Sequence, residues 1–336
     1  MSIHHEVLGM PGRDNALWLT IDSGQSTSRL LFDCGEGCLA TKHGDVTAID
    51  ELFFSHLHMD HVGGFDSFFR CNFSRNTRRN RIWGPPGTAR ILQHRFRGFL
   101  WNLYEELEGT WFVGDIGTDT VRTSRFELRE EFATPHPAGE VPFTSTILEH
   151  EGYSIETMPL DHRTPSMAYV VREPSRSNID PARLAASGLR PGPWMQRLKD
   201  DAAVSATVEV GGVSYELEPL RRDLLRRTPG DSIAYLTDFR LSEETLPGVA
   251  SWLAGCRTLV CESQYGNADA ELATRHRHMT TGLTGRLARE AGVDRLVLIH
   301  LSDRYSEPEW RDMLAEAREE FPNTDFPPNW ELCLQG

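Results

Sequence analysis

Cysteine is scarce in this sequence, and the six cysteines that it has are not arranged in pairs. Structural zinc ribbons need C-x-x-C pairs, and disulfide frameworks occur in short, cysteine-dense secreted chains. This chain has 336 residues and no C-x-x-C motif. We therefore expect neither a disulfide scaffold nor a zinc ribbon, and we predict reduced thiols in a protein core. The six are Cys34, Cys38, Cys71, Cys256, Cys261 and Cys333.

Long apolar runs are also missing. The N-terminus, MSIHHEVLGM, has no basic segment followed by an apolar one, and no later apolar run approaches the ~18 residues that span a bilayer. Apolar residues make up 39% of the chain and charged residues 25%, which is typical of globular proteins. We expect a cytoplasmic protein with no membrane partner.

Positive charge is in deficit, since 35 Lys and Arg residues face 49 Asp and Glu residues, for a net charge of -14. This balance argues against a protein that coats nucleic acid non-specifically, because such binding rests on cations that neutralise phosphates. Two local basic stretches remain, at residues 70–81 and 221–227. Either one fits a solvated face. The first also interleaves its arginines with Phe68, Phe69 and Phe73, a mixture that holds single-stranded nucleic acid in other proteins.

Strand-like runs outnumber helical ones and occur in groups within each half of the chain. This order favours an α/β fold in which one sheet packs on another and helices cover the outside. We expect one domain over residues 1–336. Residues 173–230 interrupt the pattern with Pro, Gly, Arg and Asp, and we interpret them as an inserted arm. The stretch SATVEVGGVSYEL within it predicts a hairpin that turns on Gly211 and Gly212.

The stretch ELFFSHLHMDHVGG, residues 51–64, places three histidines and an aspartate directly behind an apolar run. Four buried polar groups would be costly to satisfy in a core without a metal ion. Imidazole and carboxylate together suit zinc or a related divalent cation. The H-x-H-x-D-H cluster therefore predicts a metal site on His56, His58, Asp60 and His61.

Three further apolar strands also end in a possible metal ligand, at His162, Asp238 and His300. Loops at one end of a sheet can bring together groups that are distant in sequence. His136 and His150 compete with His162 on sequence grounds, and we favour His162 because it follows a clearer strand. With the H-x-H-x-D-H cluster these residues make seven ligands, the number that two ions sharing one carboxylate require. Two ions ~3.5–4 Å apart suit a phosphoryl displacement.

These residues also carry a family resemblance. SHLHMDHVGG resembles the signature of the metallo-β-lactamase fold, and the order of the later motifs is similar to that of its ribonuclease Z branch, the tRNA 3′-processing endonucleases. The resemblance implies a four-layer αββα sandwich with an inserted, protruding, substrate-binding arm at about 173–230. The similar segments are LDHRTPSMAYVV, which contains Tyr169, and LRPGPWMQRLKDD, AYLTDFR and VLIHLSDRYSE.

The resemblance further implies the role of each site residue. One ion is expected on His56, His58 and His162, and a second on Asp60, His61 and His300, with Asp238 between them. Zinc is expected, with manganese as the alternative. Asp60 is expected to hold or deprotonate the attacking water, and Glu262 with His278 to relay a proton to the leaving group. His276, two residues before His278, is an alternative for that role.

The expected function is the endonucleolytic removal of 3′ trailers from precursor tRNA. RNA would be gripped by Pro191 to Lys199, and the family implies a homodimer. Some motifs depart from the family pattern, with Cys261 in place of a histidine and Met279 in place of a serine. One alternative is therefore a hydrolase of the same fold that acts on a small ester, lactone, sulfate ester or cyclic phosphodiester. A second is a non-catalytic RNA-binding module, which an intact set of seven ligands disfavours.

Overall fold

The computed structural model describes residues 2–24, 26–39, 42–102, 106–199 and 206–330. The chain divides into two compact units. Unit 1 comprises residues 1–172 and 231–336, and unit 2 comprises residues 173–230.

Unit 1 contains an eight-stranded sheet whose strands follow one another in sequence order. The pairings are parallel from β3 to β6 and antiparallel at both ends of the sheet. Its strands are β1 (Ser2–Gly9), β2 (Asn15–Asp22), β3 (Thr27–Phe32), β4 (Glu51–Phe53), β5 (Asn80–Gly84), β6 (Thr110–Ile116), β7 (Thr120–Glu127) and β8 (His136–Pro142).

A second, seven-stranded sheet completes unit 1, in the order β19-β18-β17-β16-β11-β10-β9. The arm is inserted between two neighbouring strands of this sheet, since Arg172 of β11 pairs with Ser232 of β16. The strands are β9 (Thr146–His150), β10 (Tyr153–His162), β11 (Thr164–Arg172), β16 (Ser232–Leu236), β17 (Thr258–Glu262), β18 (Arg295–Ile299) and β19 (Thr324–Asp325).

Aromatic side chains join the two sheets face to face. Phe32 of β3 stacks on Phe53 of β4 with ring centroids 4.9 Å apart, and it meets Tyr169 of β11 at 5.4 Å and Tyr235 of β16 at 6.0 Å. All four rings are buried, so they exclude water between the sheets and contribute both apolar burial and ring contacts. Successive residues alternate between faces, with Phe32 in this core and Leu31 on the opposite side of its sheet.

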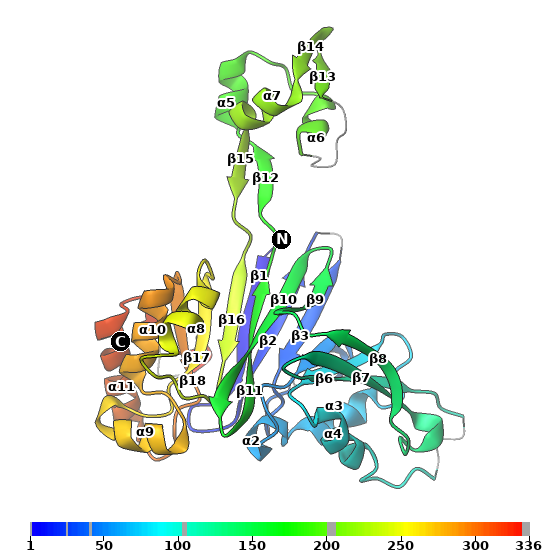
Figure 1. Ribbon diagram of the computed structural model, residues 1–336, viewed down its shortest axis with the longest axis vertical. Helices are drawn as coiled ribbons and strands as arrows, with labels where there is room; N and C mark the ends of the chain where they lie inside the picture. Colours follow the sequence, from blue (N-terminus) through cyan, green and yellow to red (C-terminus); the bar gives the residue numbers. More distant parts are fainter. Residues whose placement is uncertain (1, 25, 40–41, 103–105, 200–205, 331–336) are drawn as a thin grey trace. The chain divides into compact units, whose positions relative to one another are not determined.

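Helices cover the outer face of each sheet, as Figure 1 shows for α3 and α4 on one side and for α8, α10 and α11 on the other. The predicted αββα sandwich is thereby confirmed. Helices of the first half are α1 (His43–Thr47), α2 (Met59–Val62), α3 (Phe65–Asn72) and α4 (Thr88–Phe96), with a 3₁₀ turn at Leu128–Glu130. Those of the second half are α8 (Leu246–Leu253), α9 (Ala270–His276), α10 (Thr281–Ala291) and α11 (Glu307–Glu320), with a 3₁₀ turn at Asn267–Asp269.

Unit 2 has a core of its own, which the weak periodicity of its sequence did not indicate. Trp194 and Leu198 of α6 pack with Leu184, Val208 and Leu217. The predicted hairpin is confirmed, because β13 pairs with β14 and both Gly211 and Gly212 have positive φ angles. The elements are β12 (Arg176–Ile179), α5 (Pro181–Ser187), α6 (Trp194–Lys199), β13 (Thr207–Val210), β14 (Val213–Glu216), α7 (Leu217–Leu224) and β15 (Leu225–Thr228).

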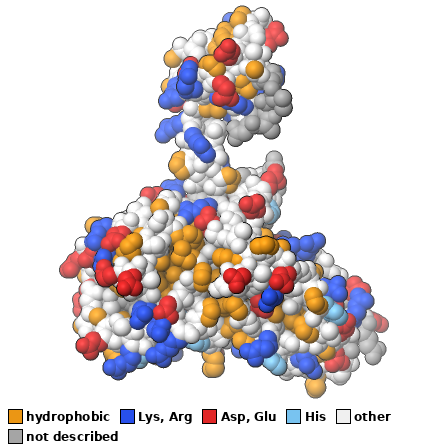
Figure 2. Space-filling model, viewed as in Figure 1, with side chains coloured by type: hydrophobic (Ala, Val, Ile, Leu, Met, Phe, Trp, Pro, Cys, Tyr) orange, Lys and Arg blue, Asp and Glu red, His pale blue; other side chains and the backbone are white. Residues whose placement is uncertain are grey.

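The arginine-rich stretch at 70–81 serves the fold of unit 1. Phe68 and Phe69 are buried in the core beneath α3, so the idea that they stack on nucleic-acid bases is wrong. Arg75 donates to the carbonyls of Thr47 and Ile49. Arg78 and Arg81 form ion pairs with Asp50 and Glu51. Figure 2 accordingly shows blue and red side chains mixed over the visible face of unit 1.

The cysteines fit the expectation of reduced thiols. The five that the structure describes are free, and all but Cys71 are buried, while Cys333 lies outside the described residues. Burial raises the pKa of Cys38 to about 12 and that of Cys256 to about 11. No helix in the described ranges combines the length and the apolar character needed to cross a membrane.

Candidate metal centre

The predicted ligands converge at the strand ends of unit 1. His56 follows β4, His162 ends β10, and Asp238 follows β16. With His58 they form a group in which one ligand atom from each residue lies within 4.8 Å of the others. The rings of His56, His58 and His162 lie 4.4 to 5.2 Å apart, centroid to centroid.

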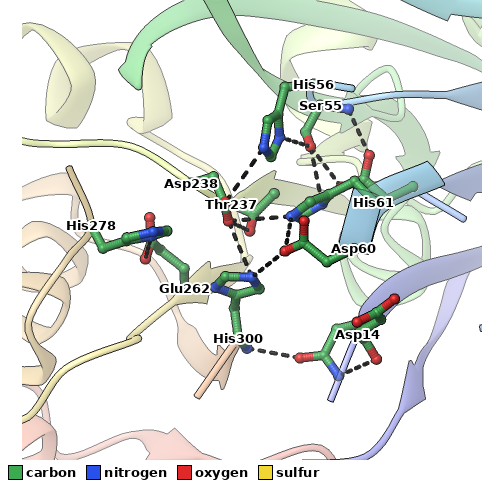
Figure 3. A network of polar contacts seen from close by, with 12 residues as sticks. Asp14, Ser55, His56, Asp60, His61, Thr237, Asp238, Glu262, His278 and His300 are labelled. Atoms are coloured by element: carbon green, nitrogen blue, oxygen red, sulfur yellow. Dashed lines mark hydrogen bonds and ion pairs between the residues drawn. The ribbon is translucent and has the colours of Figure 1, made fainter. Parts of the chain in front are cut away.

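A second group consists of Asp60, His61, Asp238 and His300, again with ligand atoms within 4.8 Å of one another. Asp60 and His61 lie in α2, and His300 follows β18. Asp238 belongs to both groups: its Oδ2 lies 3.5 Å from Nε2 of His56 and of His162, and its Oδ1 lies 3.3 Å from Nε2 of His300. Figure 3 shows this carboxylate between His56 and His300. The structure thus brings all seven predicted ligands together.

Three residues at these strand ends adopt left-handed backbone conformations. The φ angles are 61° at Asp33, 52° at Asp238 and 54° at His300. Non-glycine residues with positive φ are uncommon, and the surrounding structure must hold them there. At His300 the backbone N–H donates to Oδ1 of the buried Asn15 at 2.8 Å, and this hydrogen bond fixes the strand end.

Asp33 orients two of the histidines through one carboxylate. Its Oδ2 accepts hydrogen bonds from Nδ1 of His61 at 2.8 Å and from Oγ of Ser55 at 2.7 Å. Ser55 in turn accepts a hydrogen bond from Nδ1 of His56 at 3.1 Å. This network assigns a proton to Nδ1 of both rings and leaves both Nε2 atoms available to a ligand.

His162 is oriented in the same way from another direction. Its Nδ1 donates to the carbonyl oxygen of Arg277 at 3.0 Å, which leaves Nε2 facing Asp238. Tyr169, the aromatic residue expected near this histidine, donates its hydroxyl to the carbonyl of Phe54 at 2.8 Å. Tyr169 therefore ties β11 to the chain just before His56.

The pKa values of the residues in the two ligand groups indicate that the site favours positive charge. Burial, together with the neighbouring His61, lowers the pKa of His56 to about 2. At His300 burial also opposes the charged form, but the carboxylates of Asp238 and Asp60 outweigh it and raise the pKa to about 9. The same competition raises the pKa of His61 and lowers that of Asp238. The carboxylates of Asp238 and Asp60 therefore favour positive charge beside them, either from protonated histidines or from a bound cation.

A second observation also indicates that these residues suit a divalent ion. Within the described part of the chain, Nε2 of His56 and Nε2 of His61 are buried and make no hydrogen bond. A buried polar atom without a partner is costly, and coordination to a metal would satisfy both. Imidazole and carboxylate donors in this number suit a divalent transition metal.

Glu262 and His278 lie beside the second group. Oε2 of Glu262 accepts a hydrogen bond from Nδ1 of His278 at 3.0 Å, and Oε1 accepts one from the backbone N–H of Phe239 at 2.6 Å. The ring of His278 stacks on that of His300 at 5.6 Å. Figure 3 shows Glu262 and His278 together on the side of His300. The bond to Glu262 engages Nδ1 of His278 and leaves Nε2 as the ring nitrogen that could exchange a proton with a substrate.

The alternative histidines are engaged elsewhere. His276 bonds the hydroxyl of Tyr265 at 2.7 Å, and His136 pairs with Glu130 at 2.7 Å. His150 stacks on Tyr153 with ring centroids 4.9 Å apart. The two departures from the family pattern, Cys261 and Met279, are fully buried core residues. The altered positions therefore contribute packing.

Comparison with known proteins agrees with this geometry. A family model described as anti-Pycsar protein Apyc1 matches residues 14–162. The ribonuclease Z of Deinococcus radiodurans is 49% identical over 325 residues, which cover 96% of this chain and 97% of that protein. The chain belongs to the ribonuclease Z family. The ribonuclease Z of Brevibacillus brevis is a more distant member, 30% identical over 88% of this chain and 84% of its own length.

Two solved structures agree with the architecture. Human tRNase Z, short form, is 17% identical with a TM-score of 0.53 and covers 91% of this chain and 94% of that one. YhfI of Bacillus subtilis, a metallo-β-lactamase-fold protein, is 14% identical with a TM-score of 0.54 over 97% and 96%. At these identities the likeness establishes the fold, and the predicted metallo-β-lactamase fold is confirmed.

Sequence reasoning missed the residues that orient the ligands. Asp33 carried a usable signal, because it is a charged residue directly after the apolar strand RLLF. Asn15 carried none, since an asparagine where a turn meets the start of a strand is ordinary turn chemistry.

Proposed function

We infer that this chain is a divalent-metal-dependent phosphodiesterase that removes 3′ trailers from precursor tRNA by an endonucleolytic cut. The observation that carries this inference is the pair of ligand groups that share Asp238, with Glu262 and His278 beside them. Membership of the ribonuclease Z family supports the substrate. The alternative of a non-catalytic module is disfavoured, because binding RNA alone has no need of two such groups.

We propose that each ligand group holds one ion, with Asp238 between the two. Zinc suits the mixture of imidazole and carboxylate donors, and manganese is the alternative ion. The first ion would be held by His56, His58 and His162, and the second by Asp60, His61 and His300. When bound, the ions would offset the charge of the phosphate and make a nearby water more acidic.

The side chains then have separate tasks in the displacement. Asp60 is half-buried at the edge of the second group, where its carboxylate would orient the attacking water and accept its proton. The water oxygen bonds to phosphorus as the bond to the 3′ oxygen breaks. His278, held by Glu262, would donate the proton at Nε2 to that departing oxygen. The products are a 3′-hydroxyl on the tRNA and a 5′-phosphate on the trailer.

We propose that unit 2 grips the RNA through Pro191 to Lys199. Trp194 and Leu198 anchor α6 in the core of the unit, whereas Arg197 and Lys199 are exposed. Cations on a rigid helix suit the phosphates and 2′-hydroxyls of structured RNA. A homodimer, in which one subunit's arm serves the other, and a cytoplasmic location are parts of the same proposal.

The test is cleavage of a precursor tRNA that carries a short 3′ trailer, with bis-p-nitrophenyl phosphate as a second substrate. We expect metal-dependent cleavage next to the acceptor stem by the wild-type chain and none by His61→Ala. Hydrolysis of the small diester with untouched tRNA would overturn the substrate and favour the small-ester alternative. Loss of both activities in metal-loaded wild-type protein would overturn the phosphodiesterase itself.

A further inference from the structure

Asp161, the residue before His162, lies between two arginines from distant segments. Its carboxylate pairs with Nη1 of Arg277 and, at 3.5 Å, with Nη2 of Arg240. The backbone joins the same elements, because the N–H of Arg240 donates to the carbonyl of Asp161 at 2.8 Å. One side chain thus connects the end of β10 to two other segments, which carry Arg240, 79 residues further along the chain, and Arg277, 116 residues further along.

Each of these segments carries a residue of the site. His162 is adjacent to Asp161, His278 is adjacent to Arg277, and Asp238 lies two residues before Arg240. The carbonyl of Arg277 also accepts the hydrogen bond from Nδ1 of His162 at 3.0 Å. Arg277 therefore contacts His162 through its backbone carbonyl, and its side chain forms an ion pair with Asp161 at the end of β10.

The backbone at these points needs outside support. The φ angles are 60° at Arg163, 64° at Arg277 and 52° at Asp238, all in the left-handed region that side chains other than glycine rarely adopt. Such residues persist where surrounding contacts determine them. Arg163 adds one such contact, since its Nη2 donates to the carbonyl of Arg275 at 2.9 Å.

The ion pairs of Asp161 are partly exposed to solvent, so a role in positioning the site can be distinguished from a role in folding stability. The side chain of Asp161 is 46% exposed and that of Arg277 is 29% exposed. Ion pairs this accessible contribute little to the free energy of folding, since water screens them. Loss of a residue that orients a metal ligand, by contrast, typically costs about 10- to 100-fold in metal affinity or activity.

We propose that Asp161 is a positioning residue that holds His162, Asp238 and His278 in register by binding Arg277 and Arg240 at once. The inference rests on the proposed function, because it assigns these three residues to a metal-dependent reaction. Loss of the carboxylate removes the only one of these contacts that reaches both arginines, and it leaves the segment of His278 joined to the end of β10 by the hydrogen bonds from His162 and Arg163 alone among those described above.

The test compares Asp161→Asn with Asp325→Asn. Asp325 is a matched control: it also pairs with two arginines, Arg318 at 2.5 Å and Arg295 at 3.8 Å, and it is 42% exposed on β19. The first readout is the rate at which zinc-loaded protein releases metal to a chelator, and the second is kcat and KM for bis-p-nitrophenyl phosphate. We expect Asp161→Asn to release metal about 10-fold faster and to lose kcat with little change in KM, while both variants melt together.

Two substitutions at Arg277 complete the test. Arg277→Asn keeps a residue that tolerates positive φ but removes the pair, and it should match Asp161→Asn. Arg277→Lys keeps the charge and should recover part of the lost kcat. Equal metal release and kcat in Asp161→Asn and Asp325→Asn would overturn the proposal. Wild-type protein that binds zinc but hydrolyses no phosphodiester would overturn the proposed function, while the metal-release comparison still decides the role of Asp161.

Discussion

Oδ2 of Asp33 lies 2.8 Å from Nδ1 of His61, although 28 residues separate them in the sequence. The same carboxylate accepts from Ser55 and from the hydroxyl of Tyr235, and it is fully buried. It therefore fixes the tautomer of His61 with the proton on Nδ1, while Nε2 lies near Asp60 and Asp238. Asp33 therefore orients a predicted ligand of the centre without being in either ligand group itself.

Asp33→Asn should weaken metal binding by about 10- to 100-fold, because the amide is a poorer acceptor for Nδ1 of His61. Asparagine tolerates the positive φ of this position, so the backbone is unstrained. Chelator competition measures the affinity. Tyr235→Phe removes only one of the hydrogen bonds to Asp33 and should bind metal almost normally. Wild-type affinity in Asp33→Asn would show that the carboxylate does not tune His61.

His278→Ala should lower kcat by about 10²- to 10⁴-fold without loss of bound metal, since it removes the proposed proton donor. His276→Ala is the matched control, because this neighbouring histidine bonds Tyr265 instead of Glu262. The measurements on both variants are the rate of precursor tRNA cleavage and the metal content by elemental analysis. If the two alanine variants lose the same activity, the relay is assigned to the wrong residues.

Removal of metal should lower the melting temperature of the protein. A ligand that binds only the folded state stabilises it by about 4 kcal/mol at 1,000 times its dissociation constant. Without an ion, the buried Nε2 atoms of His56 and His61 make no hydrogen bond within the described residues. Scanning calorimetry with chelator, and then with zinc or manganese restored, measures the effect. His61→Ala should show a much smaller metal-dependent shift, and a full shift in that variant would argue for binding elsewhere.

Asn15→Ala should destabilise the fold by about 1–3 kcal/mol, because it leaves the buried N–H of His300 without an acceptor. Urea unfolding measures the change. Asn329→Ala serves as a control, since the side chain of this exposed asparagine donates to the carbonyl of Val7 and not to a residue of the site. The result expected for Asn329→Ala is a loss below that of Asn15→Ala, and the reverse order would contradict the assigned role.

Replacement of residues 173–230 by a short turn should separate recognition from chemistry. Arg172 and Ser232 are already paired across β11 and β16, so a tight connection suits the remaining strands. We expect hydrolysis of bis-p-nitrophenyl phosphate to persist and cleavage of precursor tRNA to fall at least about 10-fold, because the proposed RNA contacts are lost. Substitution of Arg197 and Lys199 by Gln in the full chain provides a milder version. Undiminished tRNA cleavage by the shortened chain would remove the arm from recognition.

Local spacing in the sequence was enough to predict much of this protein. H-x-H-x-D-H behind an apolar strand, and three more strands ending at His162, Asp238 and His300, predicted the residues that the structure brings together. The grouping of strands predicted two packed sheets. These inferences succeed because period-2 patterns and strand ends are properties of a short stretch of chain, which the sequence displays directly.

Only the tertiary structure decided which residues support the site. The hydrogen bond from His300 to Asn15 spans 285 residues, and the pair of Asp161 with Arg277 spans 116, so no local pattern encodes either. The sequence left a nucleic-acid surface open for the arginines of residues 70–81. The fold shows instead that Arg75 donates to backbone carbonyls and that Arg78 and Arg81 pair with Asp50 and Glu51. Unit 2 likewise forms its core from apolar residues too scattered to show a period. Burial and pairing depend on which strands become neighbours, and that is fixed only when the two sheets pack together.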